Sequence, residues 1–267
     1  MKNVEALISD ADGTLIDTVK LIRYGQYETA KRYLTKHGIP AGEIPEYDAY
    51  DVLLAQSVGG PARETLEKTV RLLYEQSPHH LDGMDFDELH NMLNPVQDDI
   101  AQEFVTAYEG LSEMLYALGR TGIKLAISTS GTPHHVVRNF GIALPELGMS
   151  TLYRDKSKTD EEKLGMFIDT VSDTYNLPGF TIVTANDTHK HKPYPDPFEL
   201  GMQRLGVTPD RVVVLGDHKI DMHTAINAGV ENRIGITHGF DDRETLEAGG
   251  ATRVVDSLDE MIDLLAS

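Results

Sequence analysis

The amino-acid sequence contains no cysteine among its 267 residues. This absence excludes disulfide bonds, thiolate metal sites and cysteine nucleophiles, and it is compatible with a reducing compartment. The nucleophile of any catalytic site must therefore be another residue type. Because 40% of the residues are hydrophobic, the chain can fill one large core or two modest ones without cross-links.

Long apolar runs are also missing. No stretch reaches the ~18 consecutive apolar residues that a membrane-spanning helix requires. The N-terminus enters the short apolar run Val4–Ile8 without a charged leader and a longer hydrophobic region. We therefore expect a soluble, cytoplasmic protein with no membrane partner.

Positive charge is scarce. The chain has 24 lysines and arginines against 43 aspartates and glutamates, which gives a formal net charge of -19. A solvated acidic surface accounts for most of these charges, and their field repels polyphosphate backbones, so we expect no nucleic-acid partner. A small anionic ligand would also be repelled, so its site needs local cations from a metal ion, a lysine or a helix N-terminus.

Short β-branched runs alternate with helical stretches over most of the chain. The runs predicted to be buried strands are Val4–Ile8, Ile123–Ser128, Thr181–Thr184, Arg211–Leu215, Arg233–Ile236 and Arg253–Val255. Helical periodicity occurs at Pro133–Phe140, Asp160–Tyr175, Asp196–Leu205, Lys219–Ala228 and Leu258–Leu265. This order predicts an α/β fold with a doubly wound, mostly parallel, Rossmann-like sheet.

Residues 18–109 differ because they show helical patterning and no convincing strand. Their spaced apolar positions are Leu21, Ala30, Leu34, Leu66, Val70, Leu73, Ile100, Phe104 and Ala107. Since one strand precedes this interval and the others follow it, we predict an all-helical domain at 18–109 inserted into a catalytic α/β core of residues 1–17 and 110–267. The two linkers, near Asp17–Val19 and Tyr108–Gly110, would permit hinge motion over a site.

Two carboxylates follow the first predicted strand. Asp10 and Asp12 are two residues apart and precede the turn residue Gly13. An extended backbone would place both side chains on one side, at the carboxyl end of a strand, where open α/β sheets bind ligands. The alternative is an Asx turn that only ends the strand.

A later strand delivers a second pair. Asp217 follows Val213–Gly216, and Asp221 lies one helical turn further on. A helix cap at Asp217 with a surface Asp221 is the alternative, but it leaves the match with the first pair unexplained. Carboxylates gathered at one edge repel by about 4 kcal/mol per close pair at an effective dielectric of 20. Their oxygen ligands favour Mg²⁺ over zinc, with calcium a poorer fit.

Two further segments could bind an anion. Prolines stiffen the segment around Lys192, whose ammonium could hold a phosphoryl group, although a surface turn explains the same pattern. Thr129, Ser130 and Gly131 end a strand and open a helix, and they offer hydroxyls and backbone N–H groups. An ordinary helix cap is the alternative there.

Together these segments resemble the haloacid dehalogenase (HAD) superfamily, with its Asp-x-Asp-Gly-Thr loop, strand-ending threonine, lysine before proline and Gly-Asp-x-x-x-Asp loop. Tyr108–Leu111, Ile234–Gly239 and the tail Ala248–Leu265 look like its phosphoglycolate-phosphatase-like branch. The resemblance implies a helical cap of the C1 type. It also implies phosphatase activity on a small phosphorylated metabolite.

The resemblance also implies roles for single residues. Asp10 would be the nucleophile, and Asp12 the general acid and then the general base. Thr129 and Lys192 would act on the phosphoryl group, with Ser130 and Gly131 also contacting phosphate. Mg²⁺ would be held by Asp10, Asp217 and the main-chain carbonyl of Asp12, and Asp221 would lie just beyond these direct ligands.

The sequence departs from the family pattern in three respects, one of which is that the helical insertion has no sequence assignable to one substrate. His218 stands where this branch commonly has Ser or Thr, and residues 143–179 form a longer segment than expected. A phosphosugar mutase and a catalytically silent binding protein of this fold stay open as alternatives. Carbon–halogen cleavage is disfavoured because a halide leaving group needs no acid such as Asp12. Phosphonate cleavage is disfavoured on similar grounds. Neither the particular phosphoester nor the oligomeric state follows from these patterns.

Overall fold

The computed structural model describes residues 3–54, 62–75 and 84–266. The chain forms two compact units, one made of Met1–Thr18 with Val105–Ser267 and the other of Val19–Phe104. Strand β2 (Ile16–Asp17) pairs antiparallel with β3 (Thr106–Ala107) where the chain leaves and re-enters the first unit. This pairing keeps residues 105–109 with the α/β unit.

A six-stranded sheet forms the centre of the first unit. Its strands are β1 (Ala6–Ser9), β4 (Lys124–Ser128), β5 (Phe180–Val183), β6 (Val212–Gly216), β7 (Asn232–Ile236) and β8 (Arg253–Val255). They lie in the order β5-β4-β1-β6-β7-β8, and every neighbouring pair is parallel. The predicted doubly wound α/β fold is confirmed, and all six predicted strands are present.

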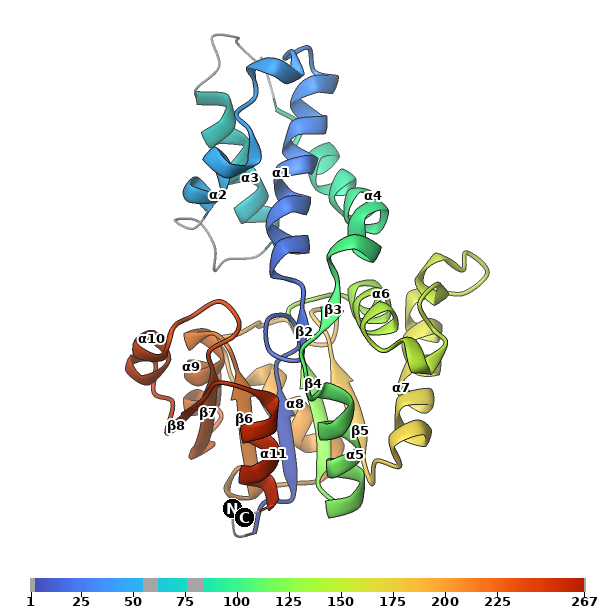
Figure 1. Ribbon diagram of the computed structural model, residues 1–267, viewed down its shortest axis with the longest axis vertical. Helices are drawn as coiled ribbons and strands as arrows, with labels where there is room; N and C mark the ends of the chain where they lie inside the picture. Colours follow the sequence, from blue (N-terminus) through green and yellow to red (C-terminus); the bar gives the residue numbers. More distant parts are fainter. Residues whose placement is uncertain (1–2, 55–61, 76–83, 267) are drawn as a thin grey trace. The chain divides into compact units, whose positions relative to one another are not determined.

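Helices cover both faces of this sheet. They are α5 (Leu111–Thr121), α6 (Pro133–Ala143), α7 (Asp160–Tyr175), α8 (Asp196–Leu205), α9 (Lys219–Asn227), α10 (Arg243–Ala248) and α11 (Leu258–Ala266). Figure 1 shows α5 and α11 on one face and α8 and α9 on the other. Side chains alternate along β1, so Ala6 and Ile8 pack in the core beneath α8 and α9. Buried on both faces, β1 is continuously apolar apart from Ser9.

Several elements differ from the prediction. Helices α5 and α10 and the short pair β2 and β3 had no predicted counterpart. The prediction that the last helix of this interval includes Ala107 is wrong, because α4 ends at Phe104 and Ala107 belongs to β3. The long segment 143–179 contains two 3-10 turns, η2 (Pro145–Leu147) and η3 (Leu152–Arg154), ahead of α7.

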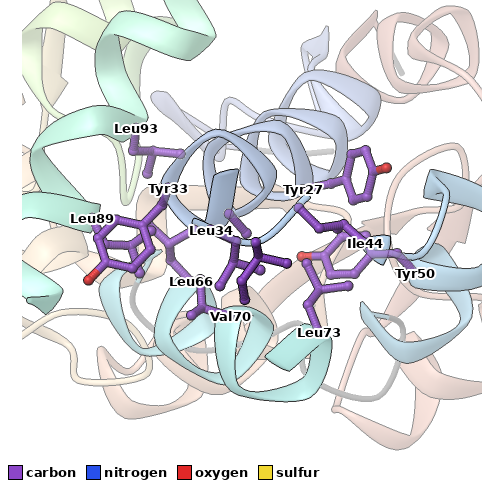
Figure 2. Close-up of a cluster of buried hydrophobic side chains, with 12 residues drawn as sticks. Tyr27, Tyr33, Leu34, Ile44, Tyr50, Leu66, Val70, Leu73, Leu89 and Leu93 are labelled. Carbon is purple, nitrogen blue, oxygen red and sulfur yellow. The ribbon is translucent and has the colours of Figure 1, made fainter. Parts of the chain in front are cut away.

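The second unit is helical and has its own core. It contains α1 (Val19–Lys36), the 3-10 turn η1 (Ala41–Glu43), α2 (Tyr47–Leu54), α3 (Ala62–Glu75) and α4 (Phe86–Phe104). Its buried apolar residues, drawn as sticks in Figure 2, are Tyr27, Ala30, Tyr33, Leu34, Ile39, Ile44, Tyr50, Leu66, Val70, Leu73, Leu89 and Leu93. The Tyr50 hydroxyl donates to Thr69 Oγ1 at 2.8 Å, so the ring is buried without leaving its polar end unpaired.

None of the helices in the described part of the chain combines the length and the apolar character needed to cross a bilayer.

Candidate active site

The carboxyl ends of neighbouring strands bring the predicted site residues together. Strand β1 lies between β4 and β6, and all three run parallel, so the residues after them reach one edge of the sheet. Asp10 follows β1, Thr129 follows β4 and Asp217 follows β6. Lys192 lies in the loop between β5 and α8. This edge is where open α/β sheets place their ligands.

Lys192 links two of the predicted carboxylates. Its Nζ donates to Asp10 Oδ1 at 2.6 Å and to Asp221 Oδ1 at 2.7 Å, and a third bond goes to the Ser128 carbonyl at 2.8 Å. The lysine side chain is 5% exposed. Burial opposes the lysine charge, but the Asp10 and Asp221 carboxylates outweigh it and raise the pKa of Lys192 above its usual value. The ammonium therefore stays charged in a buried place.

Asp217 is held from two directions. The Thr14 hydroxyl donates to Asp217 Oδ1 at 2.6 Å, and the Phe240 backbone N–H donates to Oδ2 at 2.8 Å. Thr14 Oγ1 also lies 3.5 Å from Asp10 Oδ2, so this hydroxyl stands between the two carboxylates. These contacts fix the orientation of the Asp217 carboxylate.

Two glycines leave room for this carboxylate. A side chain at Gly13, whose φ is 85°, or at Gly239 would collide with Asp217 Oδ2. The turn after β1 and the loop after β7 therefore close tightly around Asp217. Only glycine combines the positive φ of Gly13 with such a close approach at low cost.

Asp10, Asp217 and Asp221 form an acidic cluster, because each offers an oxygen within 4.8 Å of the others. Burial raises the pKa of Asp10 well above its usual value, the Lys192 charge opposes this rise, and the other two carboxylates add to it. Burial, with the charge of Asp221, raises the pKa of Asp217 to about 7. The three carboxylates thus outnumber the Lys192 ammonium, which contacts Asp10 and Asp221.

This excess of negative charge fits a hard divalent cation. Carboxylate oxygens without nitrogen or sulfur donors are the ligand set that Mg²⁺ accepts. Asp221 accepts from Lys192 through Oδ1 and from the His218 backbone N–H at 3.3 Å through Oδ2. All three carboxylates of the cluster are therefore candidate ligands of a cation.

Asp12 lies in a separate hydrogen-bonding environment. Its Oδ1 accepts from the Thr18 hydroxyl at 2.8 Å and from Asn139 Nδ2 at 3.1 Å. Its Oδ2 accepts from the Thr129 hydroxyl at 3.2 Å. The Asp12 side chain is thus held by neutral donors, whereas Asp10 accepts from the Lys192 ammonium.

The loop after β4 is compact. The Gly131 backbone N–H donates to Thr129 Oγ1 at 2.9 Å, and the loop leads into α6 through Thr132 and Pro133. Thr129 is buried, whereas Ser130 is exposed. Of the three residues predicted to contact phosphate here, Thr129 is the one that the structure joins to the carboxylates.

His218 has a structural function that the sequence left open. Its Nδ1 accepts from the Ile220 backbone N–H at 3.0 Å, which caps the first turn of α9. This is the bond that a Ser or Thr hydroxyl makes at a helix N-cap. The unusual residue therefore makes the N-cap contact of α9 itself.

Sequence reasoning gave no function to several contacts of this site. Thr14 and Thr18 were read only as parts of a loop and a linker, although both donate to carboxylates. Asn139 lies within α6, and Phe240 contributes only its backbone N–H. Spacing from the Asp10 loop could have indicated the two threonines, but no local pattern marks Asn139.

Comparison with known proteins agrees with this geometry. Pyrophosphatase PpaX of Bacillus velezensis is 26% identical over 263 residues, which cover 98% of this chain and 97% of that protein. A phosphorylated carbohydrates phosphatase of Thermotoga maritima is 28% identical over 256 residues, 94% of each chain. A predicted phosphoglycolate phosphatase of Haemophilus somnus shares the fold with a TM-score of 0.70 at 16% identity, over 99% of both chains.

The family model for haloacid dehalogenase-like hydrolases matches residues 4–229, a range that contains all the acidic residues of the site and Lys192. The predicted resemblance and the prediction of a hydrolase are confirmed, and this chain belongs to the haloacid dehalogenase-like hydrolase family.

Proposed function

We propose that this chain is a magnesium-dependent phosphatase that hydrolyses a small phosphomonoester through a phosphorylated Asp10. The observation that carries the proposal is that Lys192 contacts Asp10, with Asp217 close by in the same cluster and the Asp12 carboxylate held separately by Thr129. The two relatives named as phosphatases of pyrophosphate and of phosphorylated carbohydrates support a phosphorylated substrate.

Asp10 supplies the nucleophile. One of its oxygens attacks phosphorus, and the bond between phosphorus and the leaving oxygen breaks as the new bond forms. Lys192, which contacts Asp10 at 2.6 Å, offsets the repulsion between the carboxylate and an anionic ester. A covalent intermediate divides one difficult displacement into two easier ones.

Asp12 moves the proton in both steps. In the first, its carboxylic acid protonates the leaving oxygen. In the second, its carboxylate takes a proton from the water that attacks phosphorus, and the bond between Asp10 and phosphorus breaks. Thr129 joins this carboxylate to the loop after β4, from which its hydroxyl can also reach a phosphoryl oxygen.

Asp10, Asp217 and the main-chain carbonyl of Asp12 would hold Mg²⁺. When bound, the ion would supply positive charge to the phosphoryl oxygens. Thr14 and the Phe240 N–H keep the Asp217 carboxylate in one orientation, so little reorganisation is needed to bind a cation. The helical unit, residues 19–104, would act as a cap that excludes water during the reaction.

A phosphate-release screen over small phosphate esters, with and without Mg²⁺, tests the proposal. Magnesium-dependent release is expected from at least one ester. Asp10→Asn should abolish it while the circular dichroism spectrum stays unchanged, and the exposed α7 variant Asp169→Asn serves as the matched control. An active, magnesium-dependent Asp10→Asn enzyme would exclude the covalent route. Isomerised sugar phosphate without free phosphate would identify a mutase instead.

A further inference from the structure

Asn139 is a buried amide with hydrogen bonds on both sides. Its side chain is 4% exposed, its Nδ2 donates to Asp12 Oδ1 at 3.1 Å, and its Oδ1 accepts from Arg138 Nε at 2.9 Å. An arginine side chain has donors and no acceptor, so the amide oxygen must face Arg138. The NH₂ group must then face Asp12. The hydrogen-bonding partners of Asn139 therefore fix which end of the amide faces Asp12.

Arg138 is itself unusual, because it is 2% exposed and is among the largest fully buried side chains of the described residues. Removing a guanidinium from water costs several kcal/mol unless its hydrogen bonds are satisfied. Arg138 and Asn139 are adjacent on α6, whose start is fixed by the Thr132 cap. The helix thus brings a rigid donor to the edge of the sheet where Asp12 lies.

The hydrogen bonds of Asp12 are divided unequally between its oxygens. Each carboxylate oxygen can accept about two hydrogen bonds. Among the residues that the structure describes, Oδ1 receives two, from Thr18 and Asn139, whereas Oδ2 receives one, from Thr129. Oδ1 is therefore saturated by donors, and Oδ2 keeps a position for a proton.

We propose that Asn139 is a positioning residue that confines proton exchange to Oδ2 of Asp12. This inference rests on the proposed function. In the first step the bond between Oδ2 and hydrogen breaks, the proton passes to the leaving oxygen, and that oxygen keeps the electron pair of its broken bond to phosphorus. In the second step Oδ2 accepts a proton from the attacking water. Without Asn139, Oδ1 opens to protonation and part of the acid carries its proton on the wrong oxygen.

Two esters that differ in their need for an acid test this assignment. Phenoxide is a poor leaving group that benefits from protonation, whereas 2,4-dinitrophenoxide leaves without a proton. In Asn139→Leu, kcat/KM for phenyl phosphate should fall by roughly tenfold or more relative to 2,4-dinitrophenyl phosphate, as expected for impaired general acid catalysis. Both rates come from one preparation, so their ratio does not depend on the fraction of folded enzyme.

Further variants separate positioning from structural support. Asn139→Asp keeps the shape but not the donor, and it should lower the same ratio. In an Asp12→Ala background, Asn139→Leu should cause no additional loss on phenyl phosphate. Asn232→Leu, at the amino end of β7 and therefore at the opposite edge of the sheet, should leave the ratio unchanged.

Three results would overturn the inference: equal losses on both esters, no loss on either, or a further loss in the Asp12→Ala background. If the unmodified protein releases phosphate from neither ester nor from any other in the screen, the proposed function itself fails, and the inference falls with it. These two failures are distinguished by the unmodified protein alone.

Discussion

Asp217→Asn should stabilise the metal-free protein at alkaline pH while it abolishes magnesium binding. The pKa of Asp217 is raised from 3.8 to about 7 by burial and by the nearby charge of Asp221. A raised carboxyl pKa means that the folded protein keeps a proton that the unfolded chain releases. Stability therefore falls as the pH rises from about 4 to about 7, and the full loss remains above that range.

The size of the effect follows from this shift. A rise of about three pKa units corresponds to a loss of at most ~4 kcal/mol. Asparagine can still accept from Thr14, but its NH₂ would then face the Phe240 N–H, and this unfavourable contact costs about 1–3 kcal/mol. A net stabilisation of about 1–3 kcal/mol is expected at pH 8, and it should vanish or reverse near pH 5.

Urea unfolding of both proteins in EDTA at pH 5 and pH 8 measures this difference. Saturating Mg²⁺ should reverse the order at pH 8, since a ligand that binds only the folded state stabilises it. The control is Asp169→Asn, an exposed residue of α7, which should shift neither midpoint appreciably. If Asp217→Asn lowers stability equally at both pH values, or if Mg²⁺ leaves the unmodified protein unchanged, the electrostatic account of this cluster is refuted.

Two other substitutions probe the same edge of the sheet. Lys192→Met removes the cation from between its two carboxylate partners. The free energy of unfolding in EDTA should therefore fall by about 3–5 kcal/mol, and kcat should fall at least about a hundredfold. An unchanged free energy of unfolding would contradict the ion-pair argument. Gly239→Ala places a methyl group against Asp217 Oδ2 and should weaken magnesium binding, measured by calorimetry. Gly165→Ala, in an open position of α7, is its control and should raise stability by about 0.5–1 kcal/mol without changing magnesium affinity.

Much of the sheet could be predicted because its strands are short, apolar and buried on both faces. A short, continuously apolar run such as Val212–Leu215 is typical of a buried parallel strand. Polar residues directly after such runs mark the ligand-binding edge of the sheet. Strands β2 and β3 could not be found this way, because two residues each carry no detectable pattern. Helix α5 could have been found, since Gly110 and Gly122, both with positive φ, bracket its apolar positions.

The contacts to Asp12 show where local patterns stop being informative. Thr18 and Thr129 lie close to recognisable loops, but Asn139 is in the second turn of α6. Its contact depends on the path of the whole helix across the sheet edge, and that path is set by packing against several other elements. A single asparagine in a helical pattern carries no sign of such a contact.

The pairing of β1 with β6 has a consequence for synthesis on the ribosome. Strand β1 gains its second neighbour only when β6 has been synthesised, because Ile8 pairs with Val214. About 200 residues leave the ribosome between these two partners. At 5–20 residues per second this delay lasts roughly 10–40 s. Strand β1 therefore keeps at least one open edge throughout that period, and no truncated translation product that ends before β6 can bring Asp10, Asp217 and Asp221 together.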